Sequence, residues 1–204
     1  MNYIEKVVKE YPSLVVCEKE LEQAVAWIVE MHRVKGTLLL CGNGGSAADC
    51  EHISGELLKG FLCLRPLPEE ERAGISPALA ESLQCGVRAI PLVSLTAVGT
   101  AFSNDVAAEY AYAQLVNVFG EKENVFLGIS TSGNAANVCA AAEVARARGQ
   151  KTIAMTGEEG GKLAQICECA IRVPARETYM VQELHLPVYH ALCAEAEARI
   201  FGEG

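Results

Sequence analysis

The fold is decided by the stretch Thr37-Leu38-Leu39-Leu40-Cys41-Gly42-Asn43-Gly44-Gly45-Ser46. Its first half is a short, continuous apolar run, which is typical of a strand that is buried on both faces of a sheet. Its second half is rich in glycine, and a helical segment is predicted from about Ser46 to Phe61. The stretch therefore predicts a strand, a tight loop and a helix in immediate succession.

The same unit of strand and helix recurs along the chain. Short apolar runs predict four further strands, at 90–94, 124–129, 151–155 and 170–173. Helical segments are predicted after them, at about 105–118, at 134–148, near Lys162 and at the C-terminal end. Strands that alternate with helices run parallel through right-handed crossovers. The sequence therefore predicts an α/β fold, a three-layer α/β/α sandwich around a doubly wound, five-stranded parallel sheet.

A single domain over residues 1–204 is expected, because a chain of 204 residues can bury much of its apolar surface in one core. Residues 1–34 carry apolar positions at helical spacing, so we expect two amphipathic helices there. Residues 62–89 form an excursion longer than a typical strand–helix connection, with a short helix around 77–85. This excursion is either a surface loop without a chemical role or a lid or subunit contact.

The charge and cysteine content exclude several classes of protein. Seventeen basic and 26 acidic residues give a net charge of −9 without long runs of either sign, so we expect neither a nucleic-acid nor a membrane partner. The nine cysteines lie mostly in apolar runs and are expected to be reduced. The N-terminus lacks the apolar stretch of a signal peptide, and no run could span a bilayer. We therefore expect a cytoplasmic protein.

Two loops, each placed between a predicted strand and a predicted helix, form a candidate phosphate site. The first loop is residues 42–46, and the second loop is Ser130-Thr131-Ser132-Gly133-Asn134. Glycines, hydroxyls and the N–H groups of a helix N-terminus bind anions without a positive side chain. Either loop alone could serve only to begin a helix, with Ser46 as a plain N-cap. Because both follow parallel strands at their carboxyl ends, we expect them to converge on one phosphate.

The order strand, Gly-Asn-Gly-Gly-Ser, helix, strand, Ser-Thr-Ser-Gly-Asn, helix resembles the sugar isomerase (SIS) family of phosphosugar-binding domains over nearly the whole chain. Within that family, residues 128–134, 155–157, 160–162 and 171–174 resemble the phosphoheptose isomerases, which act on sedoheptulose 7-phosphate. The resemblance implies a flavodoxin-like SIS fold with N-terminal helices. It also implies a homotetramer.

A metal site is expected from the same resemblance. His52 and Glu56 stand four residues apart on one face of a predicted helix, where they can ligate one ion or simply form a solvated surface. By resemblance, His52, Glu56, Gln182 and His190 bind one zinc ion per subunit. Glu56 would also act as the catalytic base and His190 as the acid. Glutamine is an uncommon zinc ligand, which leaves the metal open at this point.

The spacing of two of these residues constrains how the site can be built. On an uninterrupted helix, Gln182 and His190 are about 12 Å and roughly 80° apart, so they cannot ligate one ion together. Either the helix breaks at Pro187, or the two side chains come from different subunits. We predict a composite site, in which His190 of one chain faces His52 and Glu56 of another.

Two further features have competing interpretations. Asn104 and Asp105 follow the second predicted strand, where such a pair is either a helix N-cap or, by resemblance, a contact to sugar hydroxyls. His185 lies on the Gln182 face of the C-terminal helix and is expected to be a core histidine. The residues expected to bind the substrate are Asn43, Gly44, Gly45, Ser46, Glu56, Asn104, Asp105, Ser130, Thr131, Ser132 and Gln182.

The function expected from these features is aldose–ketose isomerisation. The reaction would convert D-sedoheptulose 7-phosphate to D-glycero-D-manno-heptose 7-phosphate through an enediol intermediate. The alternatives are a non-catalytic phosphosugar-binding or protein-interaction SIS domain, or an isomerase of another sugar phosphate. Three departures from the family pattern leave the exact sugar open: Ala135 in place of a common serine, Tyr179 in place of a frequent acidic residue, and the inserted residues 64–88.

Overall fold

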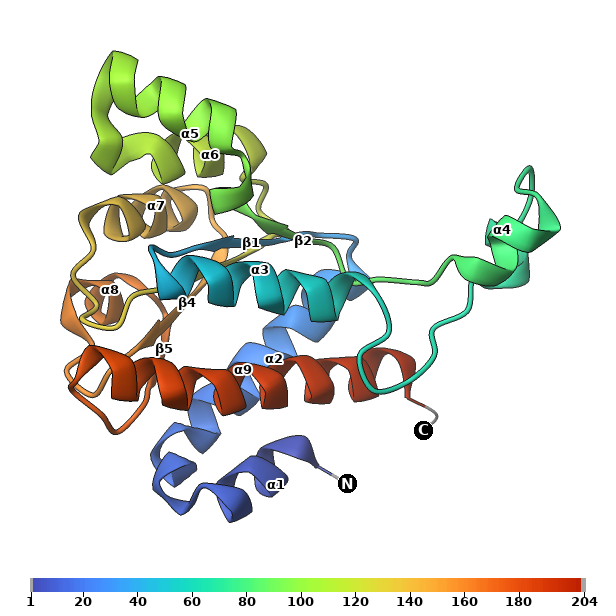
Figure 1. The fold of residues 1–204 in the computed structure, drawn as a ribbon, viewed down its shortest axis with the longest axis horizontal. Coiled ribbons are helices and arrows are strands. Elements are labelled where there is room, and N and C mark those ends of the chain that lie inside the picture. The colour runs from blue at the N-terminus through green and yellow to red at the C-terminus, as the bar shows by residue number, and fades with distance from the viewer. Residues whose placement is uncertain (1, 203–204) are drawn as a thin grey trace.

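Five parallel strands form one sheet at the centre of the computed structural model, which describes residues 2–202 (Figure 1). The strands are β1 Leu38–Cys41, β2 Ala89–Pro91, β3 Val125–Ile129, β4 Lys151–Thr156 and β5 Cys169–Arg172. Their order across the sheet is β2-β1-β3-β4-β5, and every neighbouring pair is parallel. The predicted doubly wound parallel sheet is therefore confirmed, with each strand close to its predicted position.

Four helices cover one face of the sheet. They are α1 Tyr3–Glu10, α2 Glu18–Arg33, α3 Gly45–Leu58 and α9 Thr178–Phe201. Their apolar side chains join those of the strands in one buried cluster, which includes Leu21, Ile53 and Leu192. This confirms the two N-terminal helices, although residue 1 and residues 203–204, which the expected domain includes, lie outside the described residues. The expectation of a single domain stays a prediction.

The opposite face carries a second buried cluster. Its helices include α6 Ala111–Phe119, α7 Ala136–Ala147 and α8 Gly161–Ile166. The predicted start of the helix at 105–118 is wrong. Helical structure begins earlier, with α5 Thr96–Phe102, and a π-helical turn and a 3-10 turn then separate α5 from α6. None of the helices within residues 2–202 is long and apolar enough to cross a membrane.

Helix α9 runs for 24 residues without a break, although Pro187 lies inside it. A proline removes one backbone hydrogen bond and disfavours a helix interior. Here the helix packs along its length against α1, α2 and α3, and Val181, Val188 and Leu192 are fully buried. Packing thus outweighs the local penalty, and the alternative of a helix break at Pro187 is wrong.

The strand order creates a switch point between β1 and β3. From β1 the chain moves outward to β2 and then returns across the sheet to β3, so the connections after β1 and β3 lead in opposite directions. In open parallel sheets the crevice at such a point, outside the carboxyl ends of the strands, is where ligands bind. The first loop follows β1 and the second loop follows β3. The fold therefore brings both predicted loops to this crevice.

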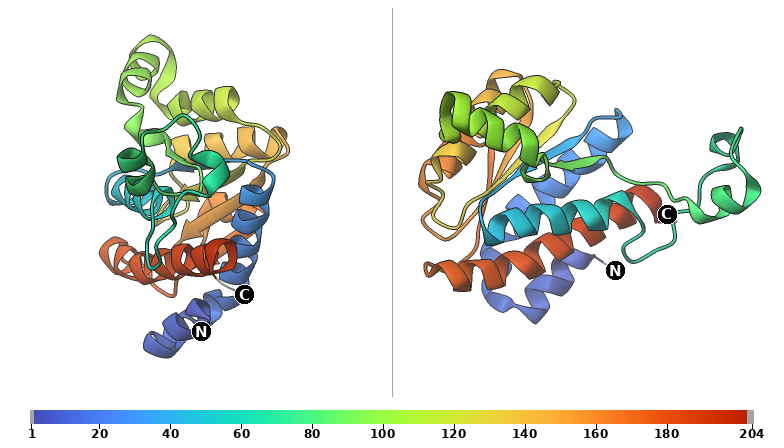
Figure 2. Two further views of the ribbon diagram at one scale, coloured as in Figure 1. Left: turned by 90° about the vertical axis from the view of Figure 1, so that its right-hand side faces the viewer. Right: turned by 45° about the horizontal axis from the view of Figure 1, so that its top comes forward.

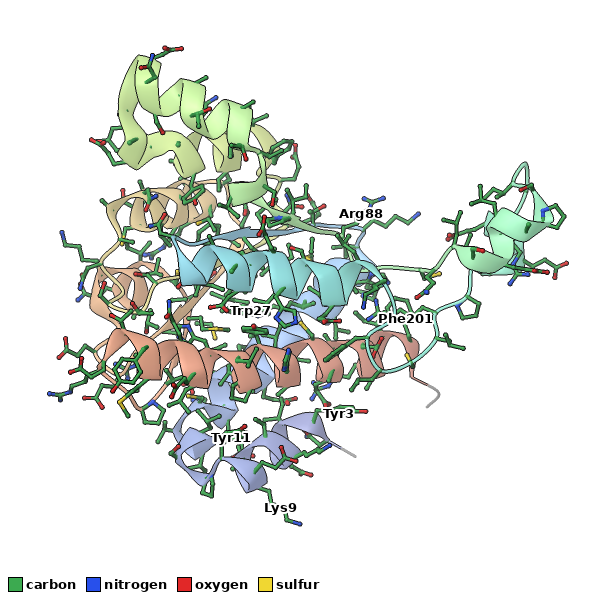
Figure 3. The ribbon with its side chains drawn as sticks, in the orientation of Figure 1. Tyr3, Lys9, Tyr11, Trp27, Arg88 and Phe201 are labelled. Atoms are coloured by element: carbon green, nitrogen blue, oxygen red, sulfur yellow. The ribbon has the colours of Figure 1, made fainter. Side chains whose placement is uncertain are left out.

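The predicted excursion, residues 62–89, leaves the body of the molecule as an arm that carries α4 Pro77–Ser82 (Figure 2). A buried ion pair anchors its base, because Arg65 Nη2 lies 2.7 Å from Glu197 Oε1 and both side chains are at most 2% exposed. The Arg65 guanidinium also stacks over Phe201, which lies near the base of the arm (Figure 3). Both interpretations of this excursion, a surface loop without a chemical role and a lid or subunit contact, stay predictions.

Candidate active site at the switch point

The first loop ends where α3 begins. Gly44 is the N-cap residue of this helix, and its φ of +56° is a conformation that favours glycine. Its helix has no side-chain cap, and Ser46 is buried inside the first turn. The interpretation of Ser46 as a plain N-cap is therefore wrong. The helix N-terminus is left to its backbone N–H groups, which is the arrangement that binds anions.

The second loop is held in shape by its own polar groups. The N–H of Gly133, which has a φ of +67°, donates to the Ser130 carbonyl, and the Ser132 hydroxyl oxygen accepts from the Asn134 N–H at 3.2 Å. The Asn134 side chain also accepts from Lys162 N–H at the start of α8. Helix α7 begins only after Ala135, again without a side-chain cap. Ser132 is exposed, and its hydroxyl is thus available to a ligand.

A pair of asparagines joins the two halves of the crevice. The side chains of Asn43 and Asn137 exchange two hydrogen bonds, of 2.8 and 2.9 Å, between the first loop and the first turn of α7. Tyr112 donates from α6 to the Gly42 carbonyl at 2.7 Å. These contacts confirm that the crevice brings the first loop beside the segment that follows the second loop. Sequence reasoning missed Asn137 and Tyr112, because only the tertiary fold brings them to the first loop.

Asn104 and Asp105 lie in the π-helical turn after α5, and both are exposed. They stand inside a helical segment and do not begin one, so the N-cap interpretation is wrong. The Asn104 amide donates to Asp105 at 2.8 Å. Asn104 also lines a cavity of about 550 Å³ together with Tyr112 and Asn137. The structure places Asn104 near the first loop, and the expected sugar contact stays a prediction.

Helices α3 and α9 lie side by side and run in the same direction (Figures 1 and 2). Three contacts follow in order along the pair. Gln182 lies so close to Gly45 that a Cβ at that position would collide with its amide nitrogen. His190 faces His52 in the middle, and Glu197 accepts the N–H of Phe61 just beyond α3. Gln182 is thus placed at the first loop, and His190 is placed further along, beside His52.

The middle contact gathers three of the four predicted metal ligands, His52, Glu56 and His190, within one chain. His52 Nε2 lies 3.2 Å from Glu56 Oε1 and 3.5 Å from His190 Nε2. Lys59 also contacts Glu56, at 3.2 Å. The expectation that His190 faces His52 and Glu56 of a different chain is therefore wrong, since the parallel packing of α3 and α9 brings its own His190 to that place. Gln182 does not join this group.

Two residues that the sequence reasoning missed, Tyr189 and Asp49, lie close to His52. The hydroxyl of Tyr189, a side chain that is 1% exposed, lies 2.9 Å from His52 Nδ1. Asp49 stands one turn before His52 on α3, and its Oδ2 atom makes no hydrogen bond within the described residues. Burial and the negative charge of Asp49 raise the pKa of Tyr189, and burial raises the pKa of Asp49. Helical spacing could have indicated Asp49, which stands one turn before His52, but Tyr189 has no local signal.

The two histidines on α9 differ in their surroundings. Burial and the neighbouring His52 lower the pKa of His190, and Glu56 opposes that shift. His185 is fully buried, and burial lowers its pKa to about 4, so it stays neutral. This agrees with the expectation that His185 is a core histidine. His190 is only partly buried and also lines a groove beside α1 with Tyr3 and Lys6.

The donor atoms around His52 have a spacing that suits zinc. Ligands on a tetrahedral zinc ion, with bonds of about 2.0–2.1 Å, are separated by about 3.4 Å. The two distances from His52 Nε2, 3.2 and 3.5 Å, are close to this value. As the side chains stand, no group of three or more His, Cys, Asp or Glu residues within 2–202 is arranged to hold a metal ion. Metal binding at this cluster therefore needs a further donor or a rotated side chain.

Comparison with known proteins places these features in a family. The sequence profile of the SIS domain matches residues 2–157. The phosphoheptose isomerase of Aneurinibacillus thermoaerophilus is 34% identical over 89% of this chain and 82% of its own length. The structure of a phosphoheptose isomerase from Francisella tularensis superposes with a TM-score of 0.77 and 27% identity over 95% of this chain and 94% of that one. The structure of phosphoheptose isomerase GmhA from Neisseria gonorrhoeae superposes with a TM-score of 0.71 and 29% identity, over 95% of this chain and 98% of that one.

The second loop can be tested with inorganic phosphate alone. We expect Ser132→Ala to weaken phosphate binding about tenfold or more, because a hydrogen bond to a charged group contributes about 1.5–3 kcal/mol. Isothermal titration calorimetry measures the dissociation constant. Ser82→Ala is the matched control, since that hydroxyl bonds only within α4 of the arm. Equal phosphate affinity in both variants would exclude the second loop as the phosphate site.

Proposed function

Because this chain belongs to the SIS domain family, and within it to the phosphoheptose isomerases, we propose that it converts D-sedoheptulose 7-phosphate to D-glycero-D-manno-heptose 7-phosphate. The protein is an isomerase, and the reaction moves a hydrogen between the two carbons of an aldose–ketose pair through an enediol. The observation that carries this proposal is the gathering of Glu56, His52 and His190 on α3 and α9, where α3 is the helix that begins at the first loop.

The phosphate of the substrate binds at the two loops. The N-terminus of α3 supplies backbone N–H groups, and the second loop supplies the hydroxyls of Thr131 and Ser132. The protein carries a net charge of −9, so these local donors, and no general positive field, must hold the dianion. Gln182, which lies against Gly45, is placed to contact the substrate at the same end of α3. Fixing the phosphate orients the carbonyl end of the sugar toward the catalytic residues.

Proton transfer is assigned to Glu56 and His190. Glu56 is the base that removes the proton beside the carbonyl and returns it to the neighbouring carbon. His190 is the acid that protonates the carbonyl oxygen as the enediol forms, and it takes the proton of the neighbouring hydroxyl as the new carbonyl forms. Both side chains meet at His52 and are partly exposed, so a sugar can reach them from solvent.

Zinc is the cofactor that this donor set fits best, with one ion per subunit. His52 Nε2, His190 Nε2 and Glu56 Oε1 are the nitrogen and carboxylate donors that zinc prefers, and the first lies 3.5 and 3.2 Å from the other two. When bound, zinc polarises the carbonyl and stabilises negative charge on the enediol oxygens. The side chains of His52 and His190 would hold the ion, and Glu56 would contact both the ion and the substrate.

A fourth donor is proposed to come from a second copy of the chain. Gln182 of the same chain lies at the first loop, about 12 Å along α9 from His190, so it cannot reach the His52 cluster. The cluster also lies on a partly open surface, with 41% of the His52 side chain exposed. A second copy that brings its own Gln182 would complete the ligand set and close the site. Together with the resemblance to the family, this favours a homotetramer with composite sites.

The cysteines support a cytoplasmic location. All nine are free, and seven of them are buried. Free thiols persist in a reducing compartment.

The base can be tested by a single charge-removing substitution. We expect Glu56→Gln to lower kcat for sedoheptulose 7-phosphate by about 10²–10⁴-fold, because a positioned acid–base group typically contributes that much. Product formation by NMR or a coupled assay measures the rate. Glu51→Gln is the control, since Glu51 lies on the same helix, is exposed and bonds only Ser94. A near-normal rate in the Glu56 variant would disprove the base assignment.

Mixed oligomers test which chain supplies each residue. If Gln182 acts on a neighbouring subunit, oligomers co-assembled from His52→Ala and Gln182→Ala chains regain activity at about a quarter of their sites. Oligomers of His52→Ala and His190→Ala chains stay inactive, because both residues serve one site within one chain. Activity of co-expressed, purified mixtures is the readout. Rescue of the His52–His190 pair would contradict the site described here, and no rescue of either pair would contradict the role of a second Gln182.

A further inference from the structure

We propose that Asn137 is a positioning residue of the phosphate site, because its side-chain amide holds Asn43 and thereby fixes the backbone of the first loop. The side chain of Asn43 is then a support of this loop and not a contact to the sugar phosphate. The inference rests on the proposed function in one respect, which is that the first loop binds the phosphate group. It assigns no step of the chemistry to either asparagine.

The first loop has few ways to hold its own shape. Between Gly42 and Gly45 the only side chain is that of Asn43, so no other residue of this stretch can anchor it through a side chain. Gly44 has a φ of +56° and faces open space. The Asn43 carbonyl accepts the N–H of Ser46 at 3.1 Å, at the start of α3. The direction of the N–H groups at this helix N-terminus therefore depends on how residue 43 is held.

The amide of Asn137 is itself fixed by the start of α7. Its Oδ1 atom accepts the N–H of Val138 at 3.0 Å and also Nδ2 of Asn43 at 2.8 Å. Its Nδ2 atom donates to Oδ1 of Asn43 at 2.9 Å. The Val138 N–H requires an acceptor, so it decides which end of the Asn137 amide carries the oxygen, and Asn43 then presents its own amide in the matching order. The first turn of α7 thus determines the orientation of the Asn43 side chain.

This pair occupies the atoms that a direct contact from Asn43 would use. Both the oxygen and the nitrogen of its amide are bonded to Asn137, so a ligand that took the same positions would have to replace two hydrogen bonds at once. Gly44 and Gly45 are exposed, and backbone N–H groups at a helix N-terminus can meet a phosphate without such an exchange. The geometry therefore favours the backbone as the ligand contact and the Asn43 side chain as its support.

The pair also connects the two loops. Asn137 stands three residues after Asn134, the last residue of the second loop, so its contact joins the start of α3 to the start of α7. Tyr112 also holds the first loop, through a hydrogen bond of 2.7 Å to the Gly42 carbonyl. That bond reaches the loop before its turn at Gly44. Loss of Asn137 should therefore release the turn while the beginning of the loop stays attached, and the protein should remain folded.

A double-mutant cycle on phosphate affinity tests this coupling. Isothermal titration calorimetry gives the dissociation constant of inorganic phosphate for wild type, Asn43→Ala, Asn137→Ala and the double variant. We expect each single substitution to weaken binding about tenfold and the double variant to bind no more weakly than either, because loss of one partner already releases the loop. Asn117→Ala is the matched control, since that amide accepts from Arg148 beyond the other end of α7 and should leave phosphate affinity unchanged.

A shorter polar side chain separates support of the loop from support of the helix. In Asn137→Ser the hydroxyl can still serve an N–H of the first turn of α7, but it is too short to reach Asn43. We expect the same loss of phosphate affinity as in Asn137→Ala, at a melting temperature close to that of wild type. Weak binding by Asn43→Ala alone, with normal binding by both Asn137 variants, would overturn the inference, because Asn43 would then contact the ligand directly. Additive losses, or no loss in any variant, would also overturn it.

The outcomes also distinguish this inference from the proposed reaction. If the cycle shows the expected coupling but the protein does not turn over sedoheptulose 7-phosphate, the asparagine pair is supported and the isomerase proposal alone fails. If the protein is an active isomerase whose phosphate affinity does not depend on Asn137, the inference alone fails. Wild-type protein that binds no phosphate would overturn the inference together with the phosphate site.

Discussion

The parallel packing of α3 against α9 is the constraint on which the site depends. Both helices lie on the same face of the sheet, and three contacts follow in order along them: Gln182 at Gly45, His190 at His52, and Glu197 at Phe61. The first contact lies at the first loop and the second at the proposed catalytic cluster of His52, Glu56 and His190. The third binds the base of the arm. One interface thus fixes the spacing between the first loop and the proposed catalytic cluster.

This spacing is the reason for the proposal that a second copy of the chain completes the site. A continuous α9 keeps Gln182 at the first loop while His190 reaches the His52 cluster, so these two residues serve different parts of one subunit. The hydroxyl of the buried Tyr189 contacts His52 Nδ1, on the side of the ring away from Glu56, and holds the ring in place. Rigid support on one side and an open surface on the other suit a site that a second subunit completes.

Much of the fold could be predicted from local sequence. Each strand is indicated by a short apolar run, and the two loops are indicated by the glycines and hydroxyl residues that follow such runs. The pairing of α3 with α9 could not be predicted, because it depends on contacts between residues more than a hundred positions apart. For the same reason the sequence places His190 on a different chain from its His52 partner and gives no signal for Tyr189. It also allows a helix break at Pro187, although tertiary packing keeps α9 continuous.

The central claim is that His52, Glu56 and His190 of one chain form a metal site. Zinc-edge anomalous diffraction from crystals of the assembled protein, grown with zinc and without substrate, tests it most directly. The account predicts one peak per subunit, about 2.0–2.1 Å from Nε2 of His52 and from Nε2 of His190 in the same chain. A peak coordinated by His52 of one chain and His190 of another, or no peak at His52, would contradict it.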